Sequence, residues 1–503
     1  MTAPTGHRRS GALSSHTLQY GAGYFIFLTC RLARDLVFAR QLGPELFSAW
    51  AALSVFRQYA AYSDLGFTNG LGRVLPRLLG RGDIGSARHA MGLAWTTAMA
   101  ATTLCTLAVL LWVWRMPPHP VHPALAVVTA IMLMYLDKQY MYVGVVLRSA
   151  ERVGASGLWS GALGLLELIT GATFAAAWGI TGAFLSVVVA STILVALMSA
   201  GQPLRAELHA QGRVFRELAS ASAILLGFGL AAVALNNVDR VVLLARGADA
   251  AVLGQYHFGA LIGLAVGQLP YVLMAVLVPQ IYRHGPEQTD RLGGLLLLPS
   301  AVFAVVGVGV VTVLWMLLPP VLHAFFPEYV AAIPIARVLM IANLVLSVAM
   351  VAENITVALD RGWGALAARW GSVAVALGGG VWALASGRGA FGVAVGMAVA
   401  QALGAVAVVA IALRGTRVGF ARYLVAALGP IACGAIVLLL LGEGLDSTRA
   451  LGPAVLRLAI CLAVLSPLAL LPLAYEGRGP LIGSSVLRFL RWNPSAGQGT
   501  GSQ

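Results

Sequence analysis

The segment Phe38-Ala-Arg-Gln-Leu-Gly-Pro-Glu-Leu-Phe-Ser-Ala-Trp50 returns later in the chain as Leu244-Ala-Arg-Gly-Ala-Asp-Ala-Ala-Val-Leu-Gly-Gln-Tyr256. This alignment places Arg40 on Arg246 and Trp50 on Tyr256, an offset of 206 residues (246 − 40 = 206). Further on, Glu151-Arg152 matches Asp360-Arg361, and Gly182-Ala-Phe184 matches Gly389-Ala-Phe391, with offsets of 209 and 207 residues. The common order and spacing predict two halves of one structural repeat.

The composition around this repeat is that of a membrane protein. Of 503 residues, 59% are hydrophobic and 10% are charged, and the mean hydropathy is +0.85. A soluble domain is about 25% charged and about 45–50% apolar, so this chain has too little polar surface to cover one compact core. That excludes a soluble enzyme. It also argues against a nucleic-acid partner, because such proteins concentrate their basic residues in patches on a polar chain.

Apolar runs of about 20 residues are long enough to cross a bilayer as helices. They predict an all-α, polytopic integral membrane protein with about fourteen transmembrane helices, over 18–39, 47–70, 87–114, 123–147, 155–177, 181–201, 219–245, 252–280, 294–318, 330–357, 364–385, 391–413, 420–441 and 451–475. We expect a cytoplasmic tail (1–17), a six-helix half (18–201), an amphipathic cytoplasmic linker (202–218), a second six-helix half (219–413), two additional helices (414–475) and a cytoplasmic tail (476–503). A plain solvated linker is the alternative for 202–218. Six is an even number, so the two halves run parallel, and such repeats place the substrate path between them.

The arginines predict the orientation. With the N-terminus in the cytoplasm, 20 arginines of the tails, loops and span ends lie on the cytoplasmic side, and five lie opposite, namely Arg40, Arg115, Arg246, Arg388 and Arg449. This bias follows the positive-inside rule and places both termini in the cytoplasm. Most of the net charge of +14 is therefore a topology signal.

The sequence gives no sign of a nucleotide-binding phosphate loop, a zinc site or a disulfide framework. Lys138 is the only lysine, so no GxxxxGK[ST] phosphate loop exists and any transport must draw on a gradient, a potential or a partner. The four cysteines lie in apolar runs without metal-ligand spacing, and they predict small buried side chains rather than a zinc site or disulfides. We expect no cofactor and no metal.

Charged residues recur inside the predicted spans, where each costs about 2.5–3.5 kcal/mol at the bilayer centre. Arg31 and Asp35 are spaced i, i+4, which predicts that they share a helix face, and Arg57 and Asp64, seven apart, are also expected on one face. We expect a polar cavity to be lined by Arg31, Arg34, Asp35, Arg57, Asp64, Lys138, Asp239 and Arg240. An excess of guanidinium over carboxylate suits a phosphate-bearing substrate, because arginine binds phosphate bidentately.

Other intramembrane charges have a plainer interpretation. Arg148, Arg337, Glu353 and Arg369 lie near span ends, where structural ion pairs or side chains reaching for the interface explain them. Glu167 stands alone in the fifth span.

Several of these segments resemble the polysaccharide (O-antigen and exopolysaccharide) flippase family of the multidrug, oligosaccharidyl-lipid and polysaccharide exporter superfamily. The resemblance rests on Cys30-Arg-Leu-Ala-Arg-Asp-Leu-Val-Phe-Ala-Arg-Gln-Leu-Gly-Pro-Glu45, Ser63-Asp-Leu-Gly-Phe67, Arg73, Pro327-Glu-Tyr-Val-Ala-Ala332 and the two-half layout. It implies a V-shaped pair of helix bundles in the bacterial cytoplasmic (inner) membrane. Such bundles carry a polyprenyl-pyrophosphate-linked oligosaccharide between leaflets by alternating access.

The same resemblance implies residue roles and partners. Arg31, Arg34, Arg57, Lys138 and Arg240 would contact pyrophosphate or acidic sugars, and Asp35, Asp64 and Asp239 would act as counter-ions or in ion coupling. The implied partners are the lipid-linked oligosaccharide, membrane lipids and the polysaccharide polymerase and chain-length machinery.

Three alternatives stay open. The lipid II (peptidoglycan precursor) flippase is similar at Ala33-Arg-Asp35 and Ala39-Arg40, although Asp64-Leu-Gly66 fits the polysaccharide branch better. A cation-coupled multidrug antiporter of the same superfamily would be expected to carry the opposite charge bias. A membrane enzyme acting on lipid-linked sugar usually needs a large extramembrane loop, which this chain lacks, so we expect a protein that is not an enzyme.

Overall fold

The computed structural model of the chain describes residues 7–114, 123–204, 206–207, 212–268, 274, 277, 281, 289–416, 418–442 and 451–476. In these ranges the chain is almost entirely helical and has no strand, which confirms the predicted all-α membrane fold. The helices are α1 (His7–Ala60), α2 (Phe67–Gly80), α3 (Ile84–Trp114), α4 (Pro123–Ser149), α5 (Val153–Ala200), α6 (Gly212–Ala245), α7 (Ala250–Gly267), α9 (Thr289–Phe325), the 3₁₀ turn η1 (Pro327–Ala332), α10 (Ile333–Ala358), α11 (Gly362–Ala385), α12 (Gly389–Leu413), α13 (Phe420–Tyr423), the π turn η2 (Leu424–Leu428), α14 (Gly429–Gly442) and α15 (Leu451–Glu476).

Two of these helices contain two traverses each. The backbone of α1 turns at Gly43 (φ 70°, ψ 169°), followed by Pro44, and that of α5 turns at Gly179 (φ 58°, ψ −136°). Glycine tolerates these positive φ angles because it has no Cβ. The predicted pairs of spans 18–39 with 47–70, and 155–177 with 181–201, are therefore joined by sharp kinks rather than by loops.

The prediction of one continuous span over 47–70 is wrong, because the helix is interrupted between Ala60 and Phe67. The chain leaves the helix after Ala60, passes through Leu65 and Gly66 at φ 52° and 76°, and resumes as α2 at Phe67. The Asp64 side chain accepts hydrogen bonds from the backbone N–H groups of Gly66 (3.1 Å) and Thr68 (3.0 Å). These bonds satisfy backbone donors at the start of α2 that the interrupted helix leaves without partners.

The structure describes part of the linker between the halves. Residues 202–204 and 206–207 are irregular, α6 begins at Gly212, and residues 205 and 208–211 lie outside the described residues, so the amphipathic linker stays a prediction. Glu207 ties the linker to α3, because its carboxylate lies 2.9 Å from Nη1 of Arg88 and 3.6 Å from Nε2 of His89. The C-terminal tail beyond residue 476 and the loop 115–122 lie outside the described residues.

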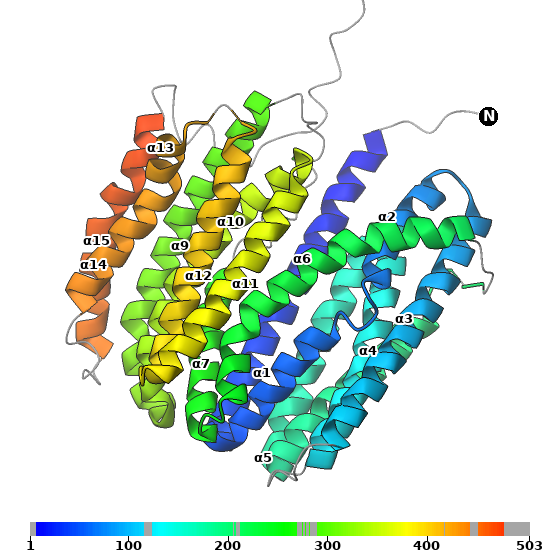
Figure 1. Cartoon of the computed structure of the whole chain (residues 1–503), viewed down its shortest axis with the longest axis horizontal. Helices are drawn as coiled ribbons and strands as arrows, with labels where there is room; N and C mark the ends of the chain where they lie inside the picture. The colour runs from blue at the N-terminus through cyan, green and yellow to red at the C-terminus, as the bar shows by residue number, and fades with distance from the viewer. Residues whose placement is uncertain are drawn as a thin grey trace, which may run out of the picture.

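The helices form two groups (Figure 1). The N-half comprises α1–α5, and the C-half comprises α6–α12, flanked on its far side by α14 and α15. In Figure 1, α6 crosses between the groups, and α1 and α7 meet in the middle. Their contact, with aromatic residues of η1, belongs to one apolar core that joins the halves at the Gly43 end.

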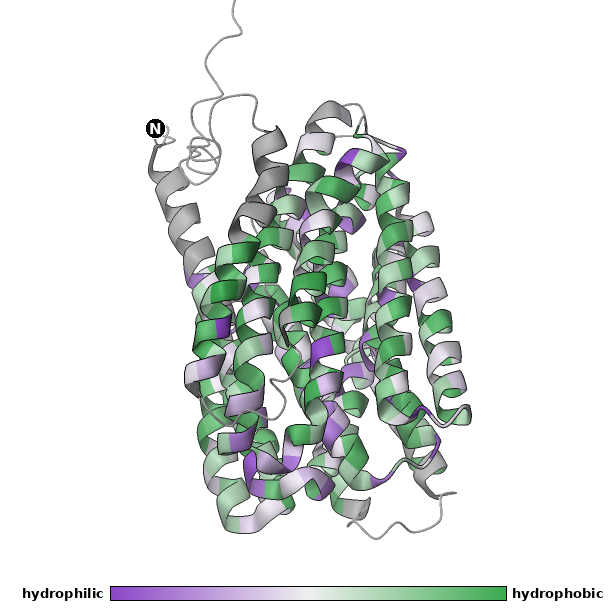
Figure 2. Ribbon diagram, turned by 90° about the vertical axis from the view of Figure 1, so that its left-hand side faces the viewer, coloured by the Kyte–Doolittle hydropathy of each residue, from purple (hydrophilic) through white to green (hydrophobic). Residues whose placement is uncertain are grey.

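The outside of the bundle suits a bilayer. Figure 2 shows hydrophobic residues along most of the helix surfaces, with hydrophilic residues only scattered among them. Among the described residues, eight helices are long and apolar enough to cross a membrane by length and composition alone. Helices α1 and α4 are not among these eight, and both carry the buried charges described next.

Candidate functional site

A cavity of about 430 Å³ lies between the two halves, among α1, α4, α5, α6 and α7. Its two walls differ in chemistry. The N-half wall carries the charged side chains Arg31, Arg34, Asp35, Arg57 and Asp137, whereas the polar side chains of the C-half wall are the amides of Asn236 and Gln268. We call this space the arginine cavity. It brings together four of the eight predicted site residues, Arg31, Arg34, Asp35 and Arg57.

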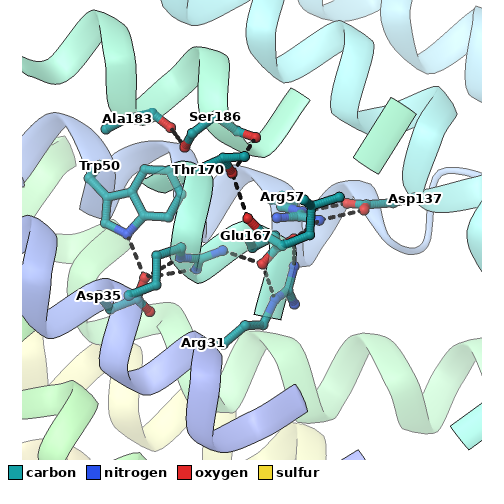
Figure 3. Close-up of polar contacts among 11 residues, drawn as sticks. Arg31, Asp35, Trp50, Arg57, Asp137, Glu167, Thr170, Ala183 and Ser186 are labelled. Atoms are coloured by element: carbon teal, nitrogen blue, oxygen red, sulfur yellow. Dashed lines mark hydrogen bonds and ion pairs between the residues drawn. The ribbon is translucent and has the colours of Figure 1, made fainter. Parts of the chain in front are cut away.

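Glu167 is the hub of the charged wall (Figure 3). Its carboxylate accepts hydrogen bonds from Nε and Nη2 of Arg31, at 2.8 and 3.0 Å, and from Nη1 of Arg34. Nη2 of Arg57 lies 3.6 Å away. The Glu167 side chain has no exposed surface. The three guanidinium groups therefore surround a carboxylate that a ligand in the cavity cannot contact.

Two glycines that flank Glu167 are a sequence signal for this role. Gly164 and Gly171 lie three residues before and four residues after Glu167, on the same face of α5. A Cβ at Gly164 would come within 2.8 Å of the backbone of Phe27, and one at Gly171 within 3.0 Å of the Arg34 side chain. This glycine stripe lets α5 approach α1 closely, so an acidic residue within it faces whatever α1 presents.

Asp35 pairs with its neighbour Arg34 and not with Arg31. Its carboxylate lies 2.8 Å from Nη2 of Arg34 and accepts a 3.2 Å hydrogen bond from the indole of Trp50. The guanidinium of Arg34 also lies over the Trp50 ring, 4.8 Å from its centroid. Arg31, expected on the same helix face as Asp35, turns toward Glu167 on α5 instead.

Arg57 makes a two-pronged pair with Asp137, in which both hydrogen bonds measure 2.6 Å. With Glu167, the cluster therefore contains three arginines and three carboxylates. The cavity lining itself contains three arginines and two aspartates, because Glu167 lies behind them. The predicted excess of guanidinium is thus smaller than the sequence indicated, although the groups nearest the cavity retain it.

Lys138 and Asp64 form a separate buried pair on the far side of α4. Nζ of Lys138 lies 3.0 Å from the Asp64 carboxylate and also donates to the carbonyl of Ala61. Both residues are almost fully buried, and neither lines the arginine cavity. The expectation that Arg57 and Asp64 share a face is wrong, because the helix is interrupted between them.

Arg240 and Asp239 form a second separate pair. The carboxylate of Asp239 lies 3.4 Å from Nε of Arg240 and accepts a 2.8 Å hydrogen bond from the Tyr256 hydroxyl. Arg240 also donates to the carbonyl of Asn236, and His257 lies 3.4 Å from its Nη1. Only 1% of Arg240 is exposed, so this cluster is sealed off from the arginine cavity.

A second cavity, of about 600 Å³, lies between α2, α6, α10 and α11. Its polar lining comprises Arg73, Asn236, Glu353, Asn354, Asp360 and Arg369, with Trp363 beside them. Arg369 pairs with Glu353. Asn236 lines this cavity and the arginine cavity alike.

The halves close together at the end of the molecule that holds the Gly43 turn. The Tyr329 hydroxyl of η1 donates to the carbonyl of Ala39 (3.0 Å), and the rings of Phe47 and His257 lie 5.3 Å apart. A Cβ at Gly254 would collide with the Pro44 carbonyl. The second cavity lies toward the opposite end, where α10 ends and α11 begins, so the two ends of the path are not equivalent.

No protein-family model matches the sequence, and no curated protein matches it. Solved structures match most of the chain. An inward-facing multidrug resistance MATE transporter of the MOP superfamily is 13% identical, with a TM-score of 0.64 over 77% of this chain and 94% of the other. The Vibrio cholerae MATE transporter VcmN is 17% identical, with a TM-score of 0.59 over 81% and 98%. The lipid II flippase MurJ is 11% identical, with a TM-score of 0.58 over 90% and 98%. This chain therefore has the fold that MOP superfamily transporters and the lipid II flippase share.

Proposed function

We propose that this chain is a flippase that moves a polyprenyl-pyrophosphate-linked oligosaccharide across the bacterial cytoplasmic membrane, for exopolysaccharide or O-antigen synthesis. The observation that carries the proposal is the arginine cavity, which offers three guanidinium groups to a ligand between the two halves of a membrane transporter fold. Intramembrane charge is costly and marks substrate pathways. The presence of three arginines at one cavity favours a phosphate-bearing ligand.

The hydrogen-bonding capacity of the arginines favours an anionic ligand. Each guanidinium has five N–H donors, and Arg31 bonds to Glu167 through Nε and Nη2. Arg31 is also the most accessible of the three, with 28% of its side chain exposed. A phosphate arriving from the cavity side would meet the remaining donors. An organic cation would meet Asp35 and Asp137, which are already occupied by Arg34 and Arg57.

The asymmetry of the two ends supports alternating access. Contacts between the halves close the Gly43 end, and the second cavity lies toward the opposite end. If the orientation expected from the arginine bias holds, the closed end faces outward and the second cavity faces the cytoplasm. A rocking of one half against the other would expose the arginine cavity to each leaflet in turn. A polymerase and chain-length machinery would then use the flipped substrate.

Lipid II is the second candidate substrate. The match to the lipid II flippase extends over 90% of this chain, whereas the MATE matches extend over 77% and 81%. Both candidate substrates carry a polyprenyl pyrophosphate, so the arginine cavity fits either.

A translocation assay tests the proposal. Purified protein is reconstituted into liposomes with polyprenyl-pyrophosphate-linked saccharides from the producing strain, and leaflet-specific labelling follows their movement. We expect movement by the wild type and about 10–100-fold slower movement by Arg57→Ala, since a hydrogen bond to a charged group contributes about 1.5–3 kcal/mol.

Two further variants make the assay specific. Arg57→Lys keeps the charge but loses the two-pronged geometry, and it should be intermediate. Arg88→Ala, which removes an exposed arginine paired with Glu207, should match the wild type. Movement of lipid II alone would favour the second candidate, and an Arg57→Ala protein with normal stability and wild-type rate would refute the role of the arginine cavity.

A further inference from the structure

The second cavity has a composition unlike that of the arginine cavity. Its apolar walls come from both sides, with Leu225 and Phe228 on α6 and Leu346 and Met350 on α10. Its charged lining comprises two arginines, Arg73 and Arg369, and two acids, Glu353 and Asp360. The formal charges of this lining cancel, so the cavity favours neither an anion nor a cation. What it offers is a dense set of hydrogen-bond donors and acceptors on planar side chains.

Arg369 gives this cavity a polar group that lacks a full set of partners. The residue is 8% exposed and pairs with Glu353 through Nη2, while its buried Nε makes no hydrogen bond among the described residues. A buried donor without a partner is destabilising, so the Glu353–Arg369 pair does not use the full hydrogen-bonding capacity of this guanidinium.

The mouth of the cavity carries an aromatic surface. Trp363, in the first turn of α11, lines the cavity and is 69% exposed. An exposed indole next to amide and carboxylate groups offers a flat apolar face and a polar edge at once. The C–H face of a sugar ring and its ring of hydroxyl groups require this combination. Ligand sites generally pair apolar walls with a few placed polar groups, in volumes of about 300–1,000 Å³.

The position of Asn236 links the two cavities. This residue lines both, so the two cavities are neighbours on either side of one side chain of α6. We propose that the second cavity is the saccharide site, in which Glu353, Asn354 and Arg369 hydrogen-bond sugar hydroxyls and Trp363 stacks on a sugar ring. The pyrophosphate would then occupy the arginine cavity. This inference rests on the proposed function and adds to it the part of the protein that reads the glycan.

A binding experiment with two probes tests the saccharide site. The first probe is the pool of polyprenyl-pyrophosphate-linked saccharides extracted from the producing strain, and the second is undecaprenyl pyrophosphate without sugar. Dissociation constants are measured for the full chain in nanodiscs. We expect the wild type to bind the glycosylated probe more tightly than the bare one.

Trp363→Ala and Asn354→Ala should each weaken binding of the glycosylated probe about 3- to 10-fold, the range expected for one lost contact. Binding of undecaprenyl pyrophosphate should change less than twofold. Trp382→Ala is the matched control, because Trp382 is a second exposed tryptophan of α11 that does not line the cavity. It should leave both constants unchanged. Arg57→Ala should weaken both probes.

Each remaining outcome is decisive. Equal wild-type affinity for the two probes, or an equal loss of both in Trp363→Ala and Asn354→Ala, would overturn the saccharide site while the flippase proposal stands. Failure of the wild type to bind either probe would overturn both proposals. Trp363 is exposed, so its truncation is expected to leave the fold intact, and the unchanged binding of the bare probe checks this directly.

Discussion

The N-half and the C-half contain the same small cluster at the same place in the repeat. Arg34 and Arg240 are 206 residues apart, as are Trp50 and Tyr256. In each half the arginine pairs with an adjacent aspartate, and the aromatic residue donates a hydrogen bond to that aspartate. The aspartate precedes the arginine in one half and follows it in the other. This shared cluster therefore belongs to the architecture of the repeat.

The surroundings of the two clusters differ. Moving 206 residues along the chain replaces the other charges of the N-half by neutral residues: Arg31 by Asn237, Arg57 by Gly263 and Asp137 by Asn343. Glu167 corresponds to the segment 373–376, Val-Ala-Val-Ala, at offsets of 206–209. The C-half also folds into a helical bundle, and it lacks these charges. A helical half can therefore form without them, which favours assigning them to a ligand.

Among the variants that compare the two halves, Glu167→Gln should cause the largest loss of stability. Three guanidinium groups surround Glu167, and breaking a buried ion pair by removing one partner costs about 3–5 kcal/mol. The matched variant is Glu353→Gln in the C-half, where a single arginine pairs with a carboxylate that lines a cavity. We expect a clearly larger drop in unfolding midpoint for Glu167→Gln, measured for purified protein in detergent.

The same pair of variants connects stability to the proposed ligand. If Glu167 occupies the arginines in the absence of substrate, inorganic pyrophosphate should raise the unfolding midpoint of Glu167→Gln more than that of the wild type, by mass action on the freed donors. It should leave the difference between Glu353→Gln and the wild type unchanged. Equal stabilisation of all three proteins would show that Glu167 does not compete with phosphate for the arginines.

A smaller difference should separate two buried tyrosines. Tyr256→Phe removes a 2.8 Å hydrogen bond to the charged Asp239 in the sealed C-half cluster, so we expect a loss of about 1.5–3 kcal/mol. Tyr140→Phe removes a neutral 2.7 Å hydrogen bond to Ser160 at the arginine cavity, where Ser160 keeps its bond to Ser156, and about 0.5–1.5 kcal/mol is expected. The ratio of the two losses is measured by denaturant unfolding. A larger loss of unfolding free energy in Tyr140→Phe than in Tyr256→Phe would mean that the hydrogen bond at the cavity wall contributes at least as much to stability as the one in the C-half cluster.

Features that depend on local or periodic signals could be predicted from the sequence, whereas contacts between residues far apart in the sequence could not. Apolar runs, the positive-inside bias and the 206-residue offset are local or periodic signals, and they predicted the helices and the repeat. Pairing inside the membrane depends on which helices touch. Spacing along one helix therefore suggested only that Arg31 shares a helix face with Asp35, and Arg57 with Asp64. The ion-pair partners of the two arginines are Glu167 and Asp137, which lie on other helices.

The interruption after Ala60 escaped prediction for a related reason. The residues of 61–66 are no more polar than their neighbours, and the helix stops because Lys138 and Asp64 satisfy the backbone there. Lys138 lies 74 residues away in sequence from Asp64. Glu167 was recognisable only through the glycines that flank it on its own helix face, since an isolated acid in one span says nothing by itself about the three arginines on other spans.

The smallest expected difference concerns the turn that each half makes at the closed end. Gly43 and Asp249 occupy equivalent positions (249 − 43 = 206), but Gly43 uses a backbone conformation open almost only to glycine, whereas Asp249 caps α7 by accepting a 2.8 Å hydrogen bond from the N–H of Ala251. Gly43→Ala should therefore cost about 1–3 kcal/mol of strain, and Asp249→Ala about 1 kcal/mol for the lost cap. Both values are read from unfolding midpoints in detergent. Because a Cβ at Gly43 would also lie 3.2 Å from the Glu328 carboxylate of η1, Gly43→Ala should loosen the closed end. It should raise the labelling of a cysteine introduced at this end, while Asp249→Ala should not. Equal labelling of the two variants would show that the turn serves stability alone and not closure.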